Sequence, residues 1–185
     1  MNSAAVRNTF ADLKKICIIG PECTGKTTLS QALSEYYKTA WVPEYARGYL
    51  DNLNRPYEKI DLLKIAHGQI RLEEEWMREA NRLIFFDTNL LVIKIWSEHK
   101  FGDCEPEIIR QHKARTYDHY LLTDTDLPWE DDPQREHPEL RGHFKKLYTD
   151  LIHQSEVPYN ILSGTKENRL LNAIRIIDRI LSPLS

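Results

Sequence analysis

The feature that most constrains this chain is a glycine-rich segment between an apolar run and an amphipathic stretch. Residues 20–27 read GPECTGKT and fit the pattern G-x-x-x-x-G-K-[ST] without a gap. The apolar run Ile16–Gly20 predicts a buried parallel strand, and Lys26–Tyr37 predicts a helix with Leu29 and Leu33 on one face. A strand, a tight loop and a helix in this order predict an α/β fold with a phosphate-binding loop at the edge of its sheet.

The residue types in this loop suit a nucleoside triphosphate. Backbone N–H groups of such a loop surround a phosphate, and glycine lets the backbone approach it closely. The helix that begins at Lys26 directs its positive dipole end at the anion. The Lys26 ammonium is expected to reach the β- and γ-phosphates, and the Thr27 hydroxyl is expected to ligate Mg²⁺, so we predict ATP and Mg²⁺ as ligands. The predicted nucleotide-binding residues are Gly20, Glu22, Cys23, Thr24, Gly25, Lys26, Thr27, Thr28 and Arg141.

Apolar runs and amphipathic stretches alternate along the rest of the chain. Further strands are predicted at 40–43, 83–88, 119–123 and 159–163, and helices at 57–81, at 90–99 after an Asn89 cap, from near Pro106, at 142–155 and after a Thr165 cap. This alternation predicts a five-stranded parallel sheet with helices on both faces, the P-loop kinase class of fold. We expect a single domain over residues 1–185, with an N-terminal extension at 1–13 and a lid at about 124–141.

Composition narrows the class of protein. The net charge is −3, and basic residues are interspersed with acidic ones, so the concentrated basic face of a nucleic-acid-binding domain is not expected. No apolar segment approaches the ~20 residues of a membrane span, and the N-terminus lacks the pattern of a signal peptide. The three cysteines show no CxxC spacing, which disfavours a disulfide framework. We expect a cytoplasmic protein that acts on a small molecule and has no membrane or nucleic-acid partner, with its oligomeric state left open.

Two carboxylates follow predicted strands. Asp87 ends the run LIFFD, so a buried strand would deliver its carboxylate to the edge of the sheet as a second Mg²⁺ ligand beside Thr27. The alternative for Asp87 is a helix cap, which Asn89 serves equally well. Glu44 is expected to orient the acceptor hydroxyl or remove its proton. Arg47 would pair with an anionic group of the acceptor or steady Glu44, and the alternative is a surface ion pair of little energy.

The polar segment 124–138, with three prolines, is predicted to be a loop that closes over the site and keeps water from the γ-phosphate. Arg135 and Arg141 would neutralise charge on the transferred phosphoryl group, unless they belong to a merely solvated loop. Trp129 would stack on a flat substrate ring or anchor the lid. The predicted catalytic residues are Lys26, Glu44, Asp87 and Arg135, and the predicted substrate-binding residues are Glu44, Tyr45, Arg47, Asp87, Asp126 and Trp129.

Four segments together resemble a known family. GPECTGKTTL, PEYAR, LIFFDTN and the pattern D-x-P-W-x-x-D-x-x-R are similar to the ribosylnicotinamide kinase domain of NadR-type proteins, over roughly residues 14 to 181. The resemblance implies ATP-dependent phosphorylation of nicotinamide riboside to nicotinamide mononucleotide in NAD salvage. It also implies that Asp126, Trp129, Asp132 and Arg135 belong to the lid.

The chain departs from that family in two ways. Pro133 follows Asp132 where similar lids often carry glycine, which predicts a stiffer lid hinge and leaves the choice of acceptor open. The residues before Lys14 leave no room for an adenylyltransferase or operator-binding domain, so a standalone kinase domain is expected.

Other functions stay open at this stage. The chain could be a kinase for another nucleoside or for a nucleotide, a regulatory P-loop ATPase that signals to a protein, or a nucleotide-binding module without catalysis. No N-K-x-D guanine motif occurs in the sequence, which favours ATP over GTP. By analogy with related kinases, residues 163–165 would hold the adenine ring.

Overall fold

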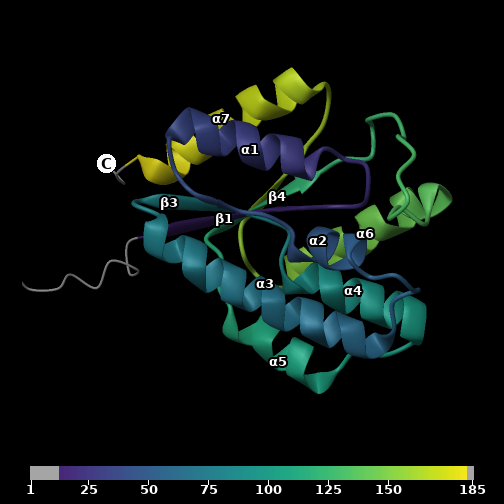
Figure 1. The fold of residues 1–185 in the computed structure, drawn as a ribbon. Coiled ribbons are helices and arrows are strands. Elements are labelled where there is room, and N and C mark those ends of the chain that lie inside the picture. The colour runs from purple at the N-terminus through teal and green to yellow at the C-terminus, as the bar shows by residue number, and fades with distance from the viewer. Residues whose placement is uncertain (1–12, 183–185) are drawn as a thin grey trace, which may run out of the picture.

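A computed structural model describes residues 13–182 as one parallel α/β sheet with helices on both faces (Figure 1). The strands in this part of the chain are β1 (Lys14–Ile19), β2 (Trp41–Val42), β3 (Leu83–Asp87), β4 (His119–Thr123) and β5 (Tyr159–Leu162). Their order in the sheet is β2-β3-β1-β4-β5, and every pair is parallel. The predicted fold class is therefore confirmed.

The helices form a layer on each side of the sheet. They are α1 (Lys26–Tyr37), α2 (Tyr45–Asp51), α3 (Lys59–Glu79), α4 (Leu90–Phe101), α5 (Pro106–Ala114), α6 (Arg141–Gln154) and α7 (Lys166–Leu181). Helices α1 and α7 cover one face through a core that includes Leu33 and Ile177. Helices α3, α4 and α6 cover the other face, and α5 packs outside α3 and α4 (Figure 1).

The central strand β1 places the phosphate loop. Residues Ile16–Ile19 are buried, as expected for a strand with neighbours on both sides and helices on both faces. Gly20 follows directly, with φ of +146°, and a Cβ atom there would lie 2.5 Å from the Thr123 hydroxyl oxygen at the end of β4. Only glycine fits this close approach, so the loop begins tightly against the carboxyl edge of the sheet.

Most predicted element boundaries agree with the structure to within a few residues. Asn89 caps α4 by accepting a hydrogen bond from Leu91 N, Thr165 caps α7, and Pro106 occupies the first turn of α5. Helix α3 begins at Lys59 rather than Tyr57 because Glu58 and Asp61 form a reciprocal capping box. These are local signals, which explains why the sequence pattern could identify them.

One helix was not predicted. Helix α2 is seven residues long and contains Gly48, so its intrinsic helical preference is weak. Contacts with α3 hold it: the Tyr45 backbone N–H donates to the Gln69 side-chain oxygen at 2.8 Å. The Tyr45 ring also lies against Gly68, where a Cβ atom would approach it to 2.1 Å. Tertiary packing, rather than local sequence, therefore decides that this segment is helical.

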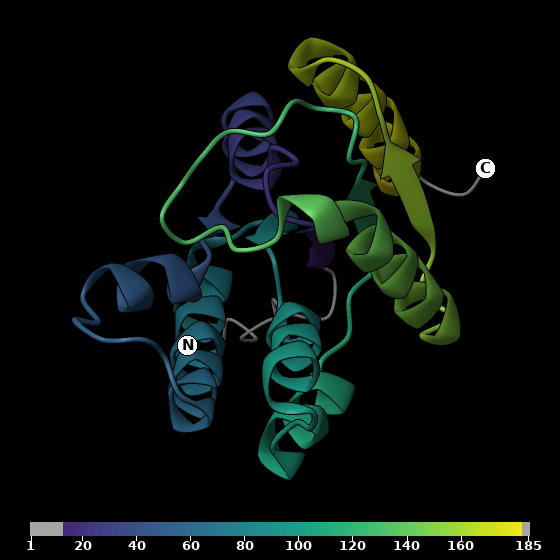
Figure 2. The same ribbon diagram turned by 90° about the vertical axis from the view of Figure 1, so that its right-hand side faces the viewer.

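The segment between β4 and α6, residues 124–140, is called the lid segment here. It is irregular except for a short 3-10 turn at Pro138–Leu140. Figure 2 shows it leaving the sheet in green, passing the phosphate loop toward α2 and returning to α6. The predicted extension at 1–12 lies outside the described residues. Within residues 13–182, no helix combines the length and apolar character that a bilayer crossing requires.

Candidate active site

A cavity of about 880 Å³ lies at the carboxyl edge of the sheet, where ligands of open α/β sheets bind. The phosphate loop lines one end of it, helices α2, α3 and α4 line the sides, and the lid segment lies over it. The predicted residues Glu44, Arg47, Asp87 and Arg135 all line this cavity. Segments that are far apart in the sequence therefore meet around one space.

The phosphate loop has the geometry of an anion site. Gly25 precedes α1 with φ of 78°, and the first backbone bond of that helix runs from Leu29 N to Gly25 O. The N–H groups of Lys26, Thr27 and Thr28 therefore precede the helical ladder and are free to bind an anion. The Lys26 ammonium donates to the Pro21 carbonyl at 2.8 Å, so it lies folded back over the loop.

Thr27 and Asp87 present oxygens suited to Mg²⁺. The Thr27 hydroxyl donates to Asp87 Oδ2 at 2.6 Å, although sixty residues separate them in the chain. The other carboxylate oxygen of Asp87 is buried and has no hydrogen-bond partner among the described residues. Burial raises the pKa of Asp87, while the hydrogen bond from Thr27 and the charge of Lys26 act in the opposite direction. These oxygens fit the hard ligand set of Mg²⁺.

Glu44 carries a carboxyl group that is ready to accept a proton. It is half-buried at the N-terminus of α2, and none of the described residues donates a hydrogen bond to its side chain. Burial, with a smaller contribution from the negative charges of Asp87 and Glu22, raises its pKa to about 7, although Lys26 and Arg47 act to lower it. A pKa near neutrality is what a general base requires at physiological pH.

The lid segment is fastened to the phosphate loop through Cys23. The Cys23 sulfur accepts from Glu130 N at 3.0 Å and from an Arg135 guanidinium N–H at 3.2 Å. The Arg141 guanidinium donates to the Cys23 and Leu127 carbonyls at 3.1 and 3.0 Å. Both predicted lid arginines thus lie beside the phosphate loop.

A second fastening joins the lid segment to α2. Arg47 and Asp132 form a two-pronged ion pair, and the Gln134 side chain donates to the Asp51 carboxylate at 2.5 Å. The predicted acceptor-binding arginine is therefore engaged by a lid aspartate, in the geometry that favours guanidinium–carboxylate pairing. Arg47 still lines the cavity.

Asp126 and Trp129 lie away from the cavity wall. Asp126 pairs with Arg169 of α7 and accepts from Gly164 N at 2.5 Å. The Trp129 indole donates to Asp131, and its ring lies 5.9 Å from the Arg141 guanidinium carbon. Neither residue is among those that line the cavity. Their predicted contact with substrate stays a prediction, as does the alternative that Trp129 anchors the lid.

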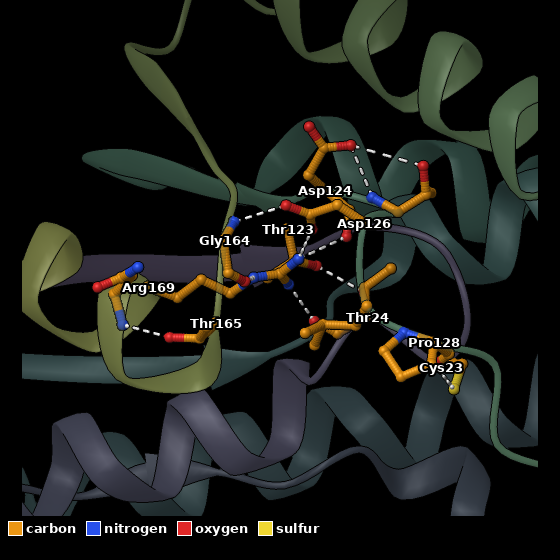
Figure 3. Close-up of polar contacts among 12 residues, drawn as sticks. Cys23, Thr24, Thr123, Asp124, Asp126, Pro128, Gly164, Thr165 and Arg169 are labelled. Carbon is orange, nitrogen blue, oxygen red and sulfur yellow. Dashed lines mark hydrogen bonds and ion pairs between the residues drawn. The ribbon is translucent and has the colours of Figure 1, made fainter.

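Sequence reasoning missed the buried residue Arg169. It is 2% exposed, and its guanidinium donates to the carbonyls of Thr24, Asp124 and Gly164 as well as to Asp126 (Figure 3). One side chain thus joins the phosphate loop, the start of the lid segment and the loop before α7. An arginine in a helical run gives no local signal of such a role.

Part of the cavity wall is apolar and aromatic, and it too was not predicted. The lining includes Tyr57, Val92, Ile93, Trp96 and Tyr148. They come from the segment before α3, from α4 and from α6. Such residues read as ordinary core positions in the sequence, because helical periodicity does not distinguish a buried face from a cavity wall.

The chain is similar to known proteins over most of its length. The AAA_28 family, described as an AAA domain, matches residues 15–169. The chain is 22% identical over 174 residues to the trifunctional NAD biosynthesis/regulator protein NadR of Escherichia coli K12, covering 89% of this chain and 42% of that protein. The chain thus spans less than half the length of this curated relative.

Solved structures share the fold. A NadR protein in complex with NAD and AMP-PNP matches with a TM-score of 0.77 and 20% identity, over 94% of this chain and 52% of that chain. A NadR protein in complex with NR matches with a TM-score of 0.75 and 20% identity, over 91% of this chain and 51% of that chain. Thymidylate kinase from Ehrlichia chaffeensis matches at 0.62 with 14% identity, over 89% and 98% of the two chains.

The resemblance to NadR proteins expected from the four sequence segments is confirmed by these matches. The family match covers most of the chain and includes the phosphate loop, both strand-end carboxylates and the lid segment. This protein therefore belongs to the AAA_28 family of AAA domains, with the P-loop fold that NadR proteins and nucleoside kinases share.

Proposed function

We propose that this protein is a kinase that transfers the γ-phosphoryl group of ATP, with Mg²⁺, to a hydroxyl of a riboside, and that nicotinamide riboside is its acceptor. The observation that carries the proposal is the single cavity that joins a phosphate loop to Glu44, whose pKa is raised to about 7. A protein that only hydrolyses ATP also uses a group that accepts a proton from water, but it has no need of a second, apolar compartment beside that group. A kinase needs both.

Each residue of the loop end has a role in this proposal. Lys26 and the first N–H groups of α1 bind the phosphates, and Arg135 of the lid segment neutralises charge on the transferred group. Thr27 and Asp87 would hold Mg²⁺, which supplies further neutralisation of that charge when bound. Glu44 takes the proton of the acceptor hydroxyl as the hydroxyl oxygen bonds to the γ-phosphorus, and the bond from that phosphorus to the β,γ-bridging oxygen breaks to release ADP. The lid segment excludes water, which would otherwise compete as acceptor.

The charge of the cavity favours a positively charged acceptor. Glu22 and Glu44 are carboxyl groups of the cavity without an ion-pair partner within residues 13–182. The three guanidinium groups of the lining are paired, Arg47 with Asp132, Arg55 with Asp61 and Arg135 with Glu130. The Tyr57 ring lies under the Lys100 ammonium and the Trp96 ring stacks on His137, so the carboxylates, rather than free aromatic faces, would attract a cationic ring such as a pyridinium. A NadR structure in complex with NR supports the same choice.

The test is to supply the purified chain with ATP, Mg²⁺ and a panel of ribosides and to identify the product by mass. We expect nicotinamide mononucleotide from nicotinamide riboside, with lower kcat/KM for uncharged nucleosides. Lys26→Ala should abolish turnover, whereas Lys146→Ala, on the exposed face of α6, should leave it unchanged. If only another nucleoside gave a phosphorylated product, the proposed acceptor would be wrong, but the proposed kinase activity would stand. ATP hydrolysis without any phosphorylated product would overturn both.

A further inference from the structure

The cavity wall contains a tyrosine whose hydroxyl group has no hydrogen-bond partner among residues 13–182. Tyr148 of α6 is 2% exposed, and its ring belongs to the apolar core between the sheet and helices α4 and α6. The residue nevertheless lines the cavity. None of the residues 13–182 forms a hydrogen bond with its phenol oxygen. The hydroxyl is not among the enclosed atoms that lack a partner, so its oxygen is open to the cavity and can pair with a ligand there.

The position of this hydroxyl identifies the part of the acceptor that it would meet. Burial raises the pKa of Tyr148 far above its ordinary value, and the nearby carboxylates of Glu44 and Glu22 raise it further. The phenol is therefore neutral, and it lies close enough to Glu44, which receives the proton of the acceptor hydroxyl, to be affected by its charge. Both residues line the cavity. Tyr148 is thus placed to meet the sugar rather than the ring of a riboside.

We propose that Tyr148 determines acceptor specificity by hydrogen-bonding a sugar hydroxyl other than the one that is phosphorylated. The inference rests on the proposed function and adds to it a residue, Tyr148, that no sequence motif identified. A neutral phenol both donates and accepts, so it pairs with a hydroxyl group in either sense. An acceptor that lacks this hydroxyl leaves the phenol buried and unpaired, which costs binding energy and produces discrimination.

The test combines Tyr148→Phe with acceptors that lack the 2′- or the 3′-hydroxyl. Phenylalanine keeps the ring in the core and removes only the oxygen. We expect KM for the full riboside to rise about tenfold, the worth of one hydrogen bond, with kcat and KM for ATP nearly unchanged. The wild-type protein should discriminate against one of the two deoxy acceptors by at least about tenfold, and Tyr148→Phe should lose that discrimination.

Tyr117→Phe is the matched control, because Tyr117 is a buried tyrosine of the same core that does not line the cavity. It should leave KM for every acceptor unchanged, and thermal unfolding should show that both variants are folded. If wild type and Tyr148→Phe discriminated equally against the deoxy acceptors, the inference would be wrong, although the proposed kinase activity would be unaffected. A shift in the pH profile of kcat without a change in KM would also overturn it, since Tyr148 would then act through Glu44. No phosphorylation of any riboside by wild type would overturn the proposed function instead.

Discussion

At the scale of single residues, Glu44 is expected to set the pH dependence of the reaction. Its pKa of about 7 means that the carboxylate, the form that accepts a proton, is lost as the pH falls below neutrality. We therefore expect kcat/KM to fall with decreasing pH below about 7. Glu44→Gln should lower kcat by roughly 10²- to 10⁴-fold and remove that pH dependence. The measurement is a pH–rate profile of both proteins.

The raised pKa of Glu44 also predicts how the stability of the protein depends on pH. The folded protein holds a proton on Glu44 up to about pH 7, whereas an unfolded chain releases it near the ordinary value of 4.5. The contribution of Glu44 to the free energy of unfolding should therefore decrease as the pH rises from about 4.5 to about 7. Glu44→Gln should lack this loss in denaturant titrations. An unchanged pH dependence in the variant would contradict the raised pKa.

Arg169 is expected to matter for stability and for nucleotide affinity together. Arg169→Met would leave the carbonyls of Thr24, Asp124 and Gly164 and the Asp126 carboxylate without their donor. We expect a loss of roughly 3 kcal/mol in the free energy of unfolding, measured by chemical denaturation. The ATP affinity should also weaken, because the phosphate loop loses its tie to α7.

The matched control for Arg169 lies on the same helix. Arg175 is exposed, and among residues 13–182 its side chain bonds only to Asn172, so Arg175→Met should change stability by no more than about 0.5 kcal/mol. Equal losses in the two variants would show that the buried guanidinium contributes nothing beyond ordinary helix surface.

At the scale of elements, the contact between α2 and α3 positions Glu44. Gly68 lies inside α3, where alanine would ordinarily stabilise a helix by about 1 kcal/mol. A Cβ atom there would lie 2.1 Å from the Tyr45 ring, so Gly68→Ala must displace α2. We expect a destabilisation of roughly 1–3 kcal/mol together with a lower kcat, since Glu44 immediately precedes Tyr45. Thermal unfolding and steady-state kinetics provide the two measurements.

Gly142→Ala in α6 is the matched control for Gly68→Ala. Nothing lies within 4 Å of a Cβ atom built there, so Gly142→Ala should be neutral or stabilising by up to about 1 kcal/mol. A stabilised Gly68→Ala with full activity would show that α2 moves freely on α3 and that its position is unimportant for the site.

At the scale of the whole molecule, nucleotide and metal should act as one ligand of the folded state. ATP with Mg²⁺ at a hundredfold excess over Kd should stabilise the protein by about 2.7 kcal/mol, which raises Tm by roughly 5–10 °C for a chain of this size. Chelation of Mg²⁺ should remove much of the shift. Asp87→Asn should make the shift nearly insensitive to chelation, because the buried carboxylate that faces Thr27 is gone. Absence of any shift with wild type would contradict the nucleotide site.

The local sequence determined the elements and the chemistry of the phosphate end. The pattern from Gly20 to Thr27, the apolar strands and the helix caps depend on neighbouring residues, so spacing alone identifies them. Strands that end at one edge of a parallel sheet must also gather their terminal residues there. This is why Thr27, Glu44 and Asp87 could be expected around one cavity before their distances were known.

Tertiary structure alone decided which distant side chains complete the site. Helix α2 forms through its packing on Gly68 and Gln69 rather than through its own propensity. Arg169 and Tyr148 lie on amphipathic helices, where the sequence pattern indicates only that a residue faces the core. Their contacts arise from the strand order β2-β3-β1-β4-β5, which brings distant segments together. Periodicity specifies which face of a helix is buried, but only the packed molecule shows whether that face meets apolar core, a loop carbonyl or a cavity.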